Sequence, residues 1–252
     1  IEMLILKYIN DNKNDKIISR EIICNSNFHN EQEKKVNIVE KEKIKSEVSL
    51  SLDSEIDGVN INNDTEIISG NWLHDMVGYA SRNHVGCVGA KLLYPNRPVQ
   101  HAGVVIGVGG IAMHANVATG DEQYGYFGRL VSIYDWSCVT AACLMIKKEK
   151  YWEVGGLDEP LKVAYNDVDF NLKLVEKGYC NVVLPDVKLF HYESLSRGND
   201  MREDQIKRFK EETDYMCDKW KSTLLRDKYY NDNLSYGYAF RLDRNSDNNE
   251  KK

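Results

Sequence analysis

Short apolar runs alternate with amphipathic stretches from Val59 onward, and this alternation limits the possible folds more than any other feature of the chain. The apolar runs predict buried strands, and stretches with apolar residues three and four positions apart predict helices. Strands that alternate with helices over this length favour an α/β fold, an open sheet flanked by helices with a crevice at the strand ends. The strands are expected at residues 59–61, 85–94, 104–106, 138–147, 182–184 and 187–190.

Helices are expected between and after these strands. Ser69 can cap the first of them, and Asn166 can cap another that runs from Asp167 to Lys177. Gly178 then ends that helix in the left-handed conformation. A short helix is expected to end near residues 155–156. Apolar stripes mark the first helix (Leu73, Met76, Val77, Ala80) and the last one (Ile206, Phe209, Thr213, Met216, Trp220).

The N-terminal part of the chain differs from the rest. It is rich in Lys, Glu, Asn and Ile, with a mixed-charge run from Glu31 to Glu55. Residues 2–9 are interpreted as a short helix, and residues 20–24 and 36–39 as short strands. The apolar periodicity is weak here, so a solvated and partly disordered segment is the alternative.

Composition excludes some classes of protein. The formal net charge is -6, with 33 Lys and Arg against 39 Asp and Glu, which does not fit a nucleic-acid binder. We find neither an apolar run long enough to span a membrane nor the pattern of a signal peptide. The six cysteines have no CxxC spacing, and several stand in apolar runs. They are expected to be reduced thiols of a cytosolic protein.

Three polar clusters stand at expected turns and carry the candidate chemistry. Asp64 follows a strand after Asn62 and Asn63, Asp167 opens a helix, and His191 follows the strand at 187–190. Carboxylates and a histidine at such turns suit a divalent metal with a phosphorylated ligand, with one carboxylate left as a base. Taken singly, each cluster also fits an ordinary polar turn, a helix start or a structural histidine.

Other residues are expected in a pocket or in loops. His101 and His114 are expected to line a pocket, and Arg197 could grip a phosphate. The glycines at 107–110 do not form a dinucleotide fingerprint. The glycine-rich segment from Gly107 to Arg129 is expected to be a lid over a bound ligand, and a plain flexible surface loop is the alternative.

Several motifs in fixed order resemble the family 2 glycosyltransferases of the GT-A fold, especially bacterial enzymes of the rhamnosyl- and galactosyltransferase type. The resemblance runs from about Val59 to about Leu242. The matching segments lie at residues 62–66, 88–95, 100–105, 125–129, 139–145, 154–159, 166–170, 191–194 and 229–234.

This resemblance implies a GT-A-like open mixed sheet and a transferase that uses a nucleotide-diphosphosugar donor. It implies that Asp64 and His191 hold Mg²⁺ or Mn²⁺, with Asn62 in the place often held by a first aspartate, and that Asp167 is the base. The donor-binding residues are then Asn62, Asn63, Asp64 and Arg197. The acceptor pocket is expected to contain Gln100, His101, Trp136, Thr140 and Asn166.

The implied acceptor is a hydroxyl of a glycan or lipid-linked glycan in surface polysaccharide biosynthesis. The implied location is the cytoplasm, with the inner face of the cell membrane left open, and nucleic acid is not an expected partner. The resemblance divides the chain into three parts: a partial nucleotide-binding part at residues 1–58, the catalytic core at 59–228 and a C-terminal tail at 229–252.

The chain also departs from the family. The first nucleotide-binding strand is apparently missing, because residue 1 falls just after it in the pattern, and residues 24–56 match poorly. A non-catalytic remnant that binds a partner and a metal-dependent nucleotide-sugar hydrolase therefore stay as alternatives.

Overall fold

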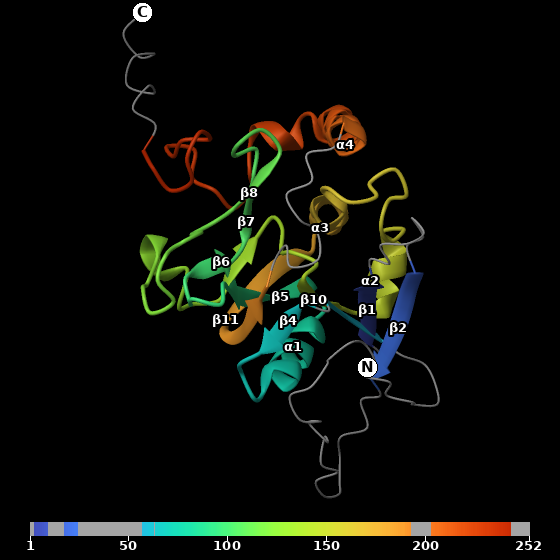
Figure 1. Cartoon of the computed structure of the whole chain (residues 1–252), viewed down its shortest axis with the longest axis vertical. Helices are drawn as coiled ribbons and strands as arrows, with labels where there is room; N and C mark the ends of the chain where they lie inside the picture. The colour runs from blue at the N-terminus through green and yellow to red at the C-terminus, as the bar shows by residue number, and fades with distance from the viewer. Residues whose placement is uncertain (1–2, 10–17, 25–56, 63, 193–202, 243–252) are drawn as a thin grey trace, which may run out of the picture.

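The computed structural model describes residues 3–9, 18–24, 57–62, 64–192 and 203–242, and for 3–9, 18–24 and 57–60 it describes the backbone only. One mixed sheet organises these residues (Figure 1). Its neighbours pair antiparallel except β5 and β11, which are parallel. The order is β1 (Met3–Ile9), β2 (Ile18–Cys24), β3 (Asp57–Ile61), β10 (Cys143–Ile146), β5 (Val85–Leu93), β11 (Cys180–His191) and β4 (Thr65–Ile67).

Short strands extend the sheet, and a hairpin stands beside it. β6 (Val99–His101) pairs with β5, and β9 (Tyr134–Trp136) pairs with β11. β7 (Val104–Ile106) and β8 (Ala112–His114) form a separate two-stranded hairpin. This hairpin points toward α4 (Glu203–Trp220) in Figure 1, and its apolar residues share a core cluster with Met216 and Trp220.

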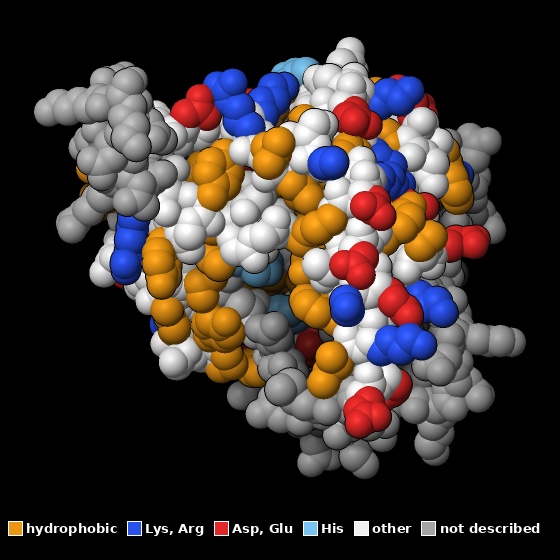
Figure 2. Space-filling view, turned by 90° about the horizontal axis from the view of Figure 1, so that it is seen from above, with side chains coloured by type: hydrophobic (Ala, Val, Ile, Leu, Met, Phe, Trp, Pro, Cys, Tyr) orange, Lys and Arg blue, Asp and Glu red, His pale blue; other side chains and the backbone are white. Residues whose placement is uncertain are grey.

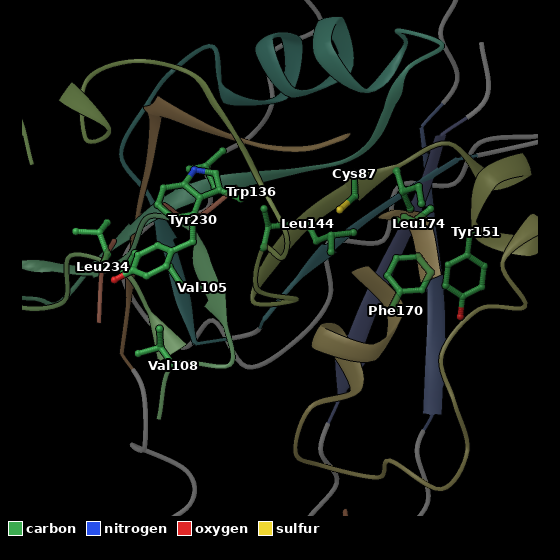
Figure 3. Close-up of a cluster of buried hydrophobic side chains, with 14 residues drawn as sticks. Cys87, Val105, Val108, Trp136, Leu144, Tyr151, Phe170, Leu174, Tyr230 and Leu234 are labelled. Carbon is green, nitrogen blue, oxygen red and sulfur yellow. The ribbon is translucent and has the colours of Figure 1, made fainter. Parts of the chain in front are cut away.

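Helices cover both faces of the sheet. α1 (Trp72–Ala80) and α3 (Asn166–Glu176) lie on opposite faces of the sheet. Successive side chains of a strand point to opposite faces, so the contacts of β10 show which face each helix covers. On β10, Cys143 and Met145 pack in the cluster that contains α1, whereas Leu144 and Ile146 pack in the cluster that contains Phe170 of α3. Figure 3 shows this second cluster. The predicted α/β sheet with flanking helices is confirmed, and α2 (Lys148–Glu153) follows β10 as predicted.

Some predicted elements differ from the observed ones. Residues 3–9 form strand β1 and not the predicted helix. A short apolar run fits either a helix or a strand, and here its pairing with β2 makes it a strand. The two strands predicted around Pro185 are one strand, β11. Its register with β5 is irregular between Leu184 and Lys188, because Pro185 has no N–H to donate to the neighbouring strand. Ser69 does not cap α1; its hydroxyl donates to the Asp186 carbonyl at 2.7 Å. The strand predicted at 36–39 lies outside the described residues.

The C-terminal segment packs against the core as far as it is described. Residues 229–242 contribute Tyr230 and Leu234 to the same cluster as Trp136. Asp227, just before them, accepts from the Ile106 N–H at 2.7 Å and the Ser137 hydroxyl at 2.8 Å. Burial raises the pKa of Asp227 above its ordinary value. Two further short helices are of the 3-10 type, η1 (Tyr126–Gly128) and η2 (Thr223–Leu225).

Glu212 of α4 holds the loop that leads into α3. Its buried carboxylate accepts three consecutive backbone N–H groups, from Lys162 at 3.0 Å, Val163 at 3.1 Å and Ala164 at 2.7 Å. Backbone N–H groups inside a protein need partners, and this loop takes them from a side chain distant in sequence. The carboxylate therefore fixes the backbone that immediately precedes Asn166.

We expect Glu212→Gln to lower the free energy of unfolding by about 1.5–3 kcal/mol, the contribution typical of hydrogen bonds to a charged group. Glu211→Gln is the matched control, because that neighbouring side chain is 65% exposed and pairs with Lys207 at 3.9 Å. The control should change stability by less than about 0.5 kcal/mol. Urea unfolding of the two variants measures the difference, and equal effects would refute the anchoring role.

Candidate functional site

A cavity of about 470 Å³ opens where β6, β8, the end of β11 and the start of α3 meet. Figure 2 shows a hollow on this face, with histidine and acidic side chains at its bottom and hydrophobic side chains at its sides. The volume suits a ligand of small-molecule size. The polar residues that line it are Asn62, Tyr94, Gln100, His101, His114, Thr140, Asn166, Asp167 and His191.

Strand pairing brings Asp64 and His191 together. β4 pairs antiparallel with β11 so that Thr65 lies opposite His191, and the Tyr192 N–H donates to the Asp64 carbonyl at 2.9 Å. This register leaves Asp64 Oδ1 3.3 Å from His191 Nε2. Asn62 reaches the same imidazole, with its Nδ2 3.5 Å from Nε2. Side chains that are distant in sequence thus converge because the two strands are neighbours.

Asp64 and His191 have the ligand types and the spacing for two of the ligands of a divalent cation. Asp64 Oδ1 is buried and accepts no hydrogen bond from any described residue. Two ligands each about 2.1 Å from one ion are roughly 3 Å apart, close to the observed separation of Oδ1 and Nε2. The described residues contain no cluster of three or more His, Cys, Asp and Glu side chains suited to a metal. An ion here would need further ligands from elsewhere, such as a bound phosphate or water.

The first turn of α3 carries Asp167 to the same cavity. Tyr165 precedes the helix with φ of 63°, and Asn166 Oδ1 accepts from the Asp167 N–H at 2.7 Å. Asp167 Oδ2 accepts from the Ala141 N–H at 3.1 Å, and Oδ1 accepts from the Val168 N–H at 2.8 Å. These amides fix the direction of the half-buried carboxylate. Each oxygen keeps a lone pair, so the carboxylate can still accept a proton.

Buried amides hold the wall beside Asp167. Asn171 Nδ2 donates to the Val139 and Asp167 carbonyls at 3.0 and 2.7 Å, and its Oδ1 accepts from the Val139 N–H at 3.1 Å. Asn181 Nδ2 donates to the Ser137 and Asn171 carbonyls at 3.1 and 3.2 Å. Residues 137–141 therefore follow a fixed path between β9 and β10. That path is why the predicted strand at 138–147 is shorter in the structure.

Two histidines that line the cavity contact each other. His101 Nε2 accepts from the backbone N–H groups of Gly103 at 3.3 Å and Thr140 at 3.4 Å, so its proton lies on Nδ1. His101 Nδ1 then donates to His114 Nδ1 at 2.8 Å. Burial, with His114 and His191 nearby, lowers the pKa of His101 well below its ordinary value. His101 is therefore a neutral, fixed part of the wall.

The cavity contains most of the residues expected from the sequence. It brings together Asn62, Gln100, His101, Thr140, Asn166, Asp167 and His191, and Asp64 contacts His191 beside it. Asn63 and Arg197 lie outside the described residues. Trp136 does not line this cavity and is buried in the core, where it packs so closely on Gly103 that a Cβ there would lie 2.2 Å from the indole. Its placement in the pocket was wrong because a large aromatic after an exposed loop gives no sign of which way it faces.

The apolar lining was not predicted. Four such residues line the cavity: Met113 of β8, Val117 from the segment after it, Leu157, and Val163 from the loop held by Glu212. Such residues carry no chemical motif, so their sequence positions gave no indication of a wall. The segment from Gly107 to Arg129 is also more anchored than a lid was expected to be, since it contains β8 and the buried residues Val108 and Ile111.

The chain is similar to segments of longer curated proteins, although no protein-family model matches it. It is 48% identical over 176 residues to the uncharacterized protein y4gI of Sinorhizobium fredii, covering 69% of this chain and 19% of that protein. It is 38% identical over 141 residues to the O-antigen biosynthesis protein RfbC of Myxococcus xanthus, covering 56% of this chain and 11% of that protein. The chain thus spans about a fifth of these relatives or less.

A third relative is an N-acetylglucosaminyl-diphospho-decaprenol L-rhamnosyltransferase of Mycobacterium tuberculosis, 29% identical over 62 residues, covering 25% of this chain and 20% of the enzyme. Two of these relatives are named for glycan synthesis. These two names support the view that this chain is related to glycosyltransferases. Among solved structures, GalNAc-T7 with UDP, GalNAc and Mn²⁺ matches 53% of this chain and 27% of its own at 12% identity, with a TM-score of 0.41, too low to bear on the site.

Proposed function

We propose that this cavity is the sugar-transfer site of a glycosyltransferase that acts in surface polysaccharide biosynthesis. The donor is a nucleotide-diphosphosugar, and the acceptor is a hydroxyl of a growing glycan or lipid-linked glycan. One observation carries the proposal: His191 and Asp167 line one cavity, and beside it Asp64 Oδ1, which has no hydrogen-bond partner among the described residues, lies 3.3 Å from His191 Nε2. The relatives named for O-antigen biosynthesis and rhamnosyl transfer agree with it.

Asp64 and His191 would hold Mg²⁺ or Mn²⁺ in this proposal, with Asn62 beside them. When bound, the ion supplies positive charge that stabilises the departing diphosphate. Asn63 and Arg197 complete the proposed donor contacts. Residues 1–58, 59–228 and 229–252 keep their proposed roles as partial nucleotide-binding part, catalytic core and tail.

Asp167 acts as the base of an inverting transfer. Its carboxylate takes the proton of the acceptor hydroxyl, and that oxygen forms a bond with the anomeric carbon of the donor. The bond from the anomeric carbon to the diphosphate oxygen breaks, and the nucleoside diphosphate leaves. The amides of Ala141 and Val168 hold the carboxylate in one direction, which favours a productive orientation.

The acceptor side of the cavity would be formed by Thr140, Asn166 and His101. The proposed location is the cytoplasm at the inner face of the cell membrane. Among the helices that the structure describes, none has the length and apolar character needed to span a bilayer.

The test is a panel of nucleotide-sugars, each added with Mn²⁺ while thermal unfolding is measured. A donor present at 100 times its dissociation constant should raise the free energy of unfolding by about 2.7 kcal/mol. The donor so identified is then incubated with and without glycan acceptors, and nucleotide release is followed. Release that depends on an acceptor supports the transferase. Equal release without any acceptor would favour the hydrolase, and no stabilisation by any donor would favour the remnant.

A further inference from the structure

Gln100 contacts His191 twice with one side chain. Gln100 Oε1 lies 2.6 Å from His191 Nδ1, and Gln100 Nε2 donates to the His191 backbone carbonyl at 3.3 Å. Gln100 is on β6 and is only 6% exposed, whereas His191 ends β11. A backbone carbonyl can only accept, so the second contact fixes which end of the amide is Nε2. The oxygen of the amide must then face the imidazole.

This orientation determines the tautomer of His191. An amide oxygen can only accept, so the proton of the neutral imidazole lies on Nδ1. Nε2 is left with a lone pair, and Asp64 Oδ1 lies 3.3 Å from it with no hydrogen bond between the two atoms. Two lone-pair atoms this close repel each other, and a divalent cation bound to both would remove the repulsion. Asn62 Nδ2, 3.5 Å from Nε2, offers only a long contact in its place.

We propose that Gln100 is a positioning residue that holds His191 with an unprotonated Nε2, which can bind a divalent cation together with Asp64. The inference rests on the proposed function for the cation, and it replaces the role of acceptor residue that the sequence suggested for Gln100. Residues behind a metal-bound histidine orient the ring and fix its proton, and their loss typically reduces metal affinity 10- to 100-fold.

The first experiment reads the tautomer without metal. Nitrogen-15 NMR of the imidazoles is recorded on the metal-free chain at one pH above neutrality, and the His191→Gln variant identifies the resonances of His191. The expected result is a neutral ring with the proton on Nδ1. In Gln100→Leu the proton should distribute between both nitrogens, while in Gln100→Glu, whose carboxylate can still accept, it should stay on Nδ1. A proton on Nε2 in the wild-type chain, alone or in an imidazolium, overturns the proposal.

The second experiment measures Mn²⁺ affinity by electron paramagnetic resonance of the free ion, with UDP, GDP and dTDP added in turn. Gln100→Leu should weaken binding 10- to 100-fold, and Gln100→Glu should restore it. Gln123→Leu is the matched control, since Gln123 is exposed and outside the cavity. Unchanged affinity in Gln100→Leu contradicts the positioning role. If the wild-type chain binds no Mn²⁺, the proposed function fails, and the NMR result still decides the tautomer.

Discussion

Asp167→Asn should lower the rate of acceptor-dependent sugar transfer by about 10²–10⁴, the range expected when a general base is removed. The amide has the shape of the carboxylate, and its oxygen can still accept from the Ala141 N–H, so the start of α3 should stay folded although the hydrogen bond from the Val168 N–H is lost. The loss should therefore fall on the turnover number, with the Michaelis constant for the donor nearly unchanged. Nucleotide release under saturating donor measures it.

The matched control for this variant is Asp135→Asn on β9. Asp135 is exposed and does not line the cavity, so the same chemical change there should leave transfer within about twofold of wild type. Thermal unfolding of both variants checks that neither has lost its fold. Transfer by Asp167→Asn within a few-fold of wild type would exclude Asp167 as the base.

The central part of the fold could be predicted because its pattern is local. β5 and β10 are buried on both faces of the sheet and stand out in the sequence as mostly apolar runs. α3 begins with polar residues and is followed by Gly178. Strands β4, β6, β8 and β9 were missed because each has three residues and includes polar ones, whereas β7, equally short, is an apolar run and was predicted. β1 was mistaken for a helix because only its pairing with β2 and β10, which no local pattern encodes, makes it a strand.

The site was predictable to the extent that its polar residues end strands or begin helices. Asp64, Asp167 and His191 occupy such positions, and an open sheet brings such positions to one crevice. The role of Gln100 was not predictable in the same way. It depends on which atoms of the amide face the imidazole, and that follows from the pairing of β6 with β5 beside β11. Contacts of this kind come from tertiary structure alone.

Removal of divalent metal should abolish transfer, and the loss should be traceable to Asp64. We expect chelation with EDTA to reduce nucleotide release to background and Mn²⁺ to restore it. Asp64→Asn should lower transfer about 10²–10³-fold, because a bound ion contributes several kcal/mol to stabilising the departing charge. Asn can donate to His191 Nε2, 3.3 Å away, so this variant should stay folded. Asp186→Asn, at an exposed carboxylate on β11, is the control.

A double variant tests whether Asp64 and His191 hold the same ion. Groups that act as one unit give strongly non-additive losses, whereas independent groups give losses that multiply. Asp64→Asn combined with His191→Gln should therefore be little worse than the more damaging single variant, and the half-saturating Mn²⁺ concentration should rise in both singles. If the two losses multiply, or if EDTA leaves transfer unchanged, the residues do not share a metal, and the contact at 3.3 Å is then a structural pairing of a carboxylate with an imidazolium.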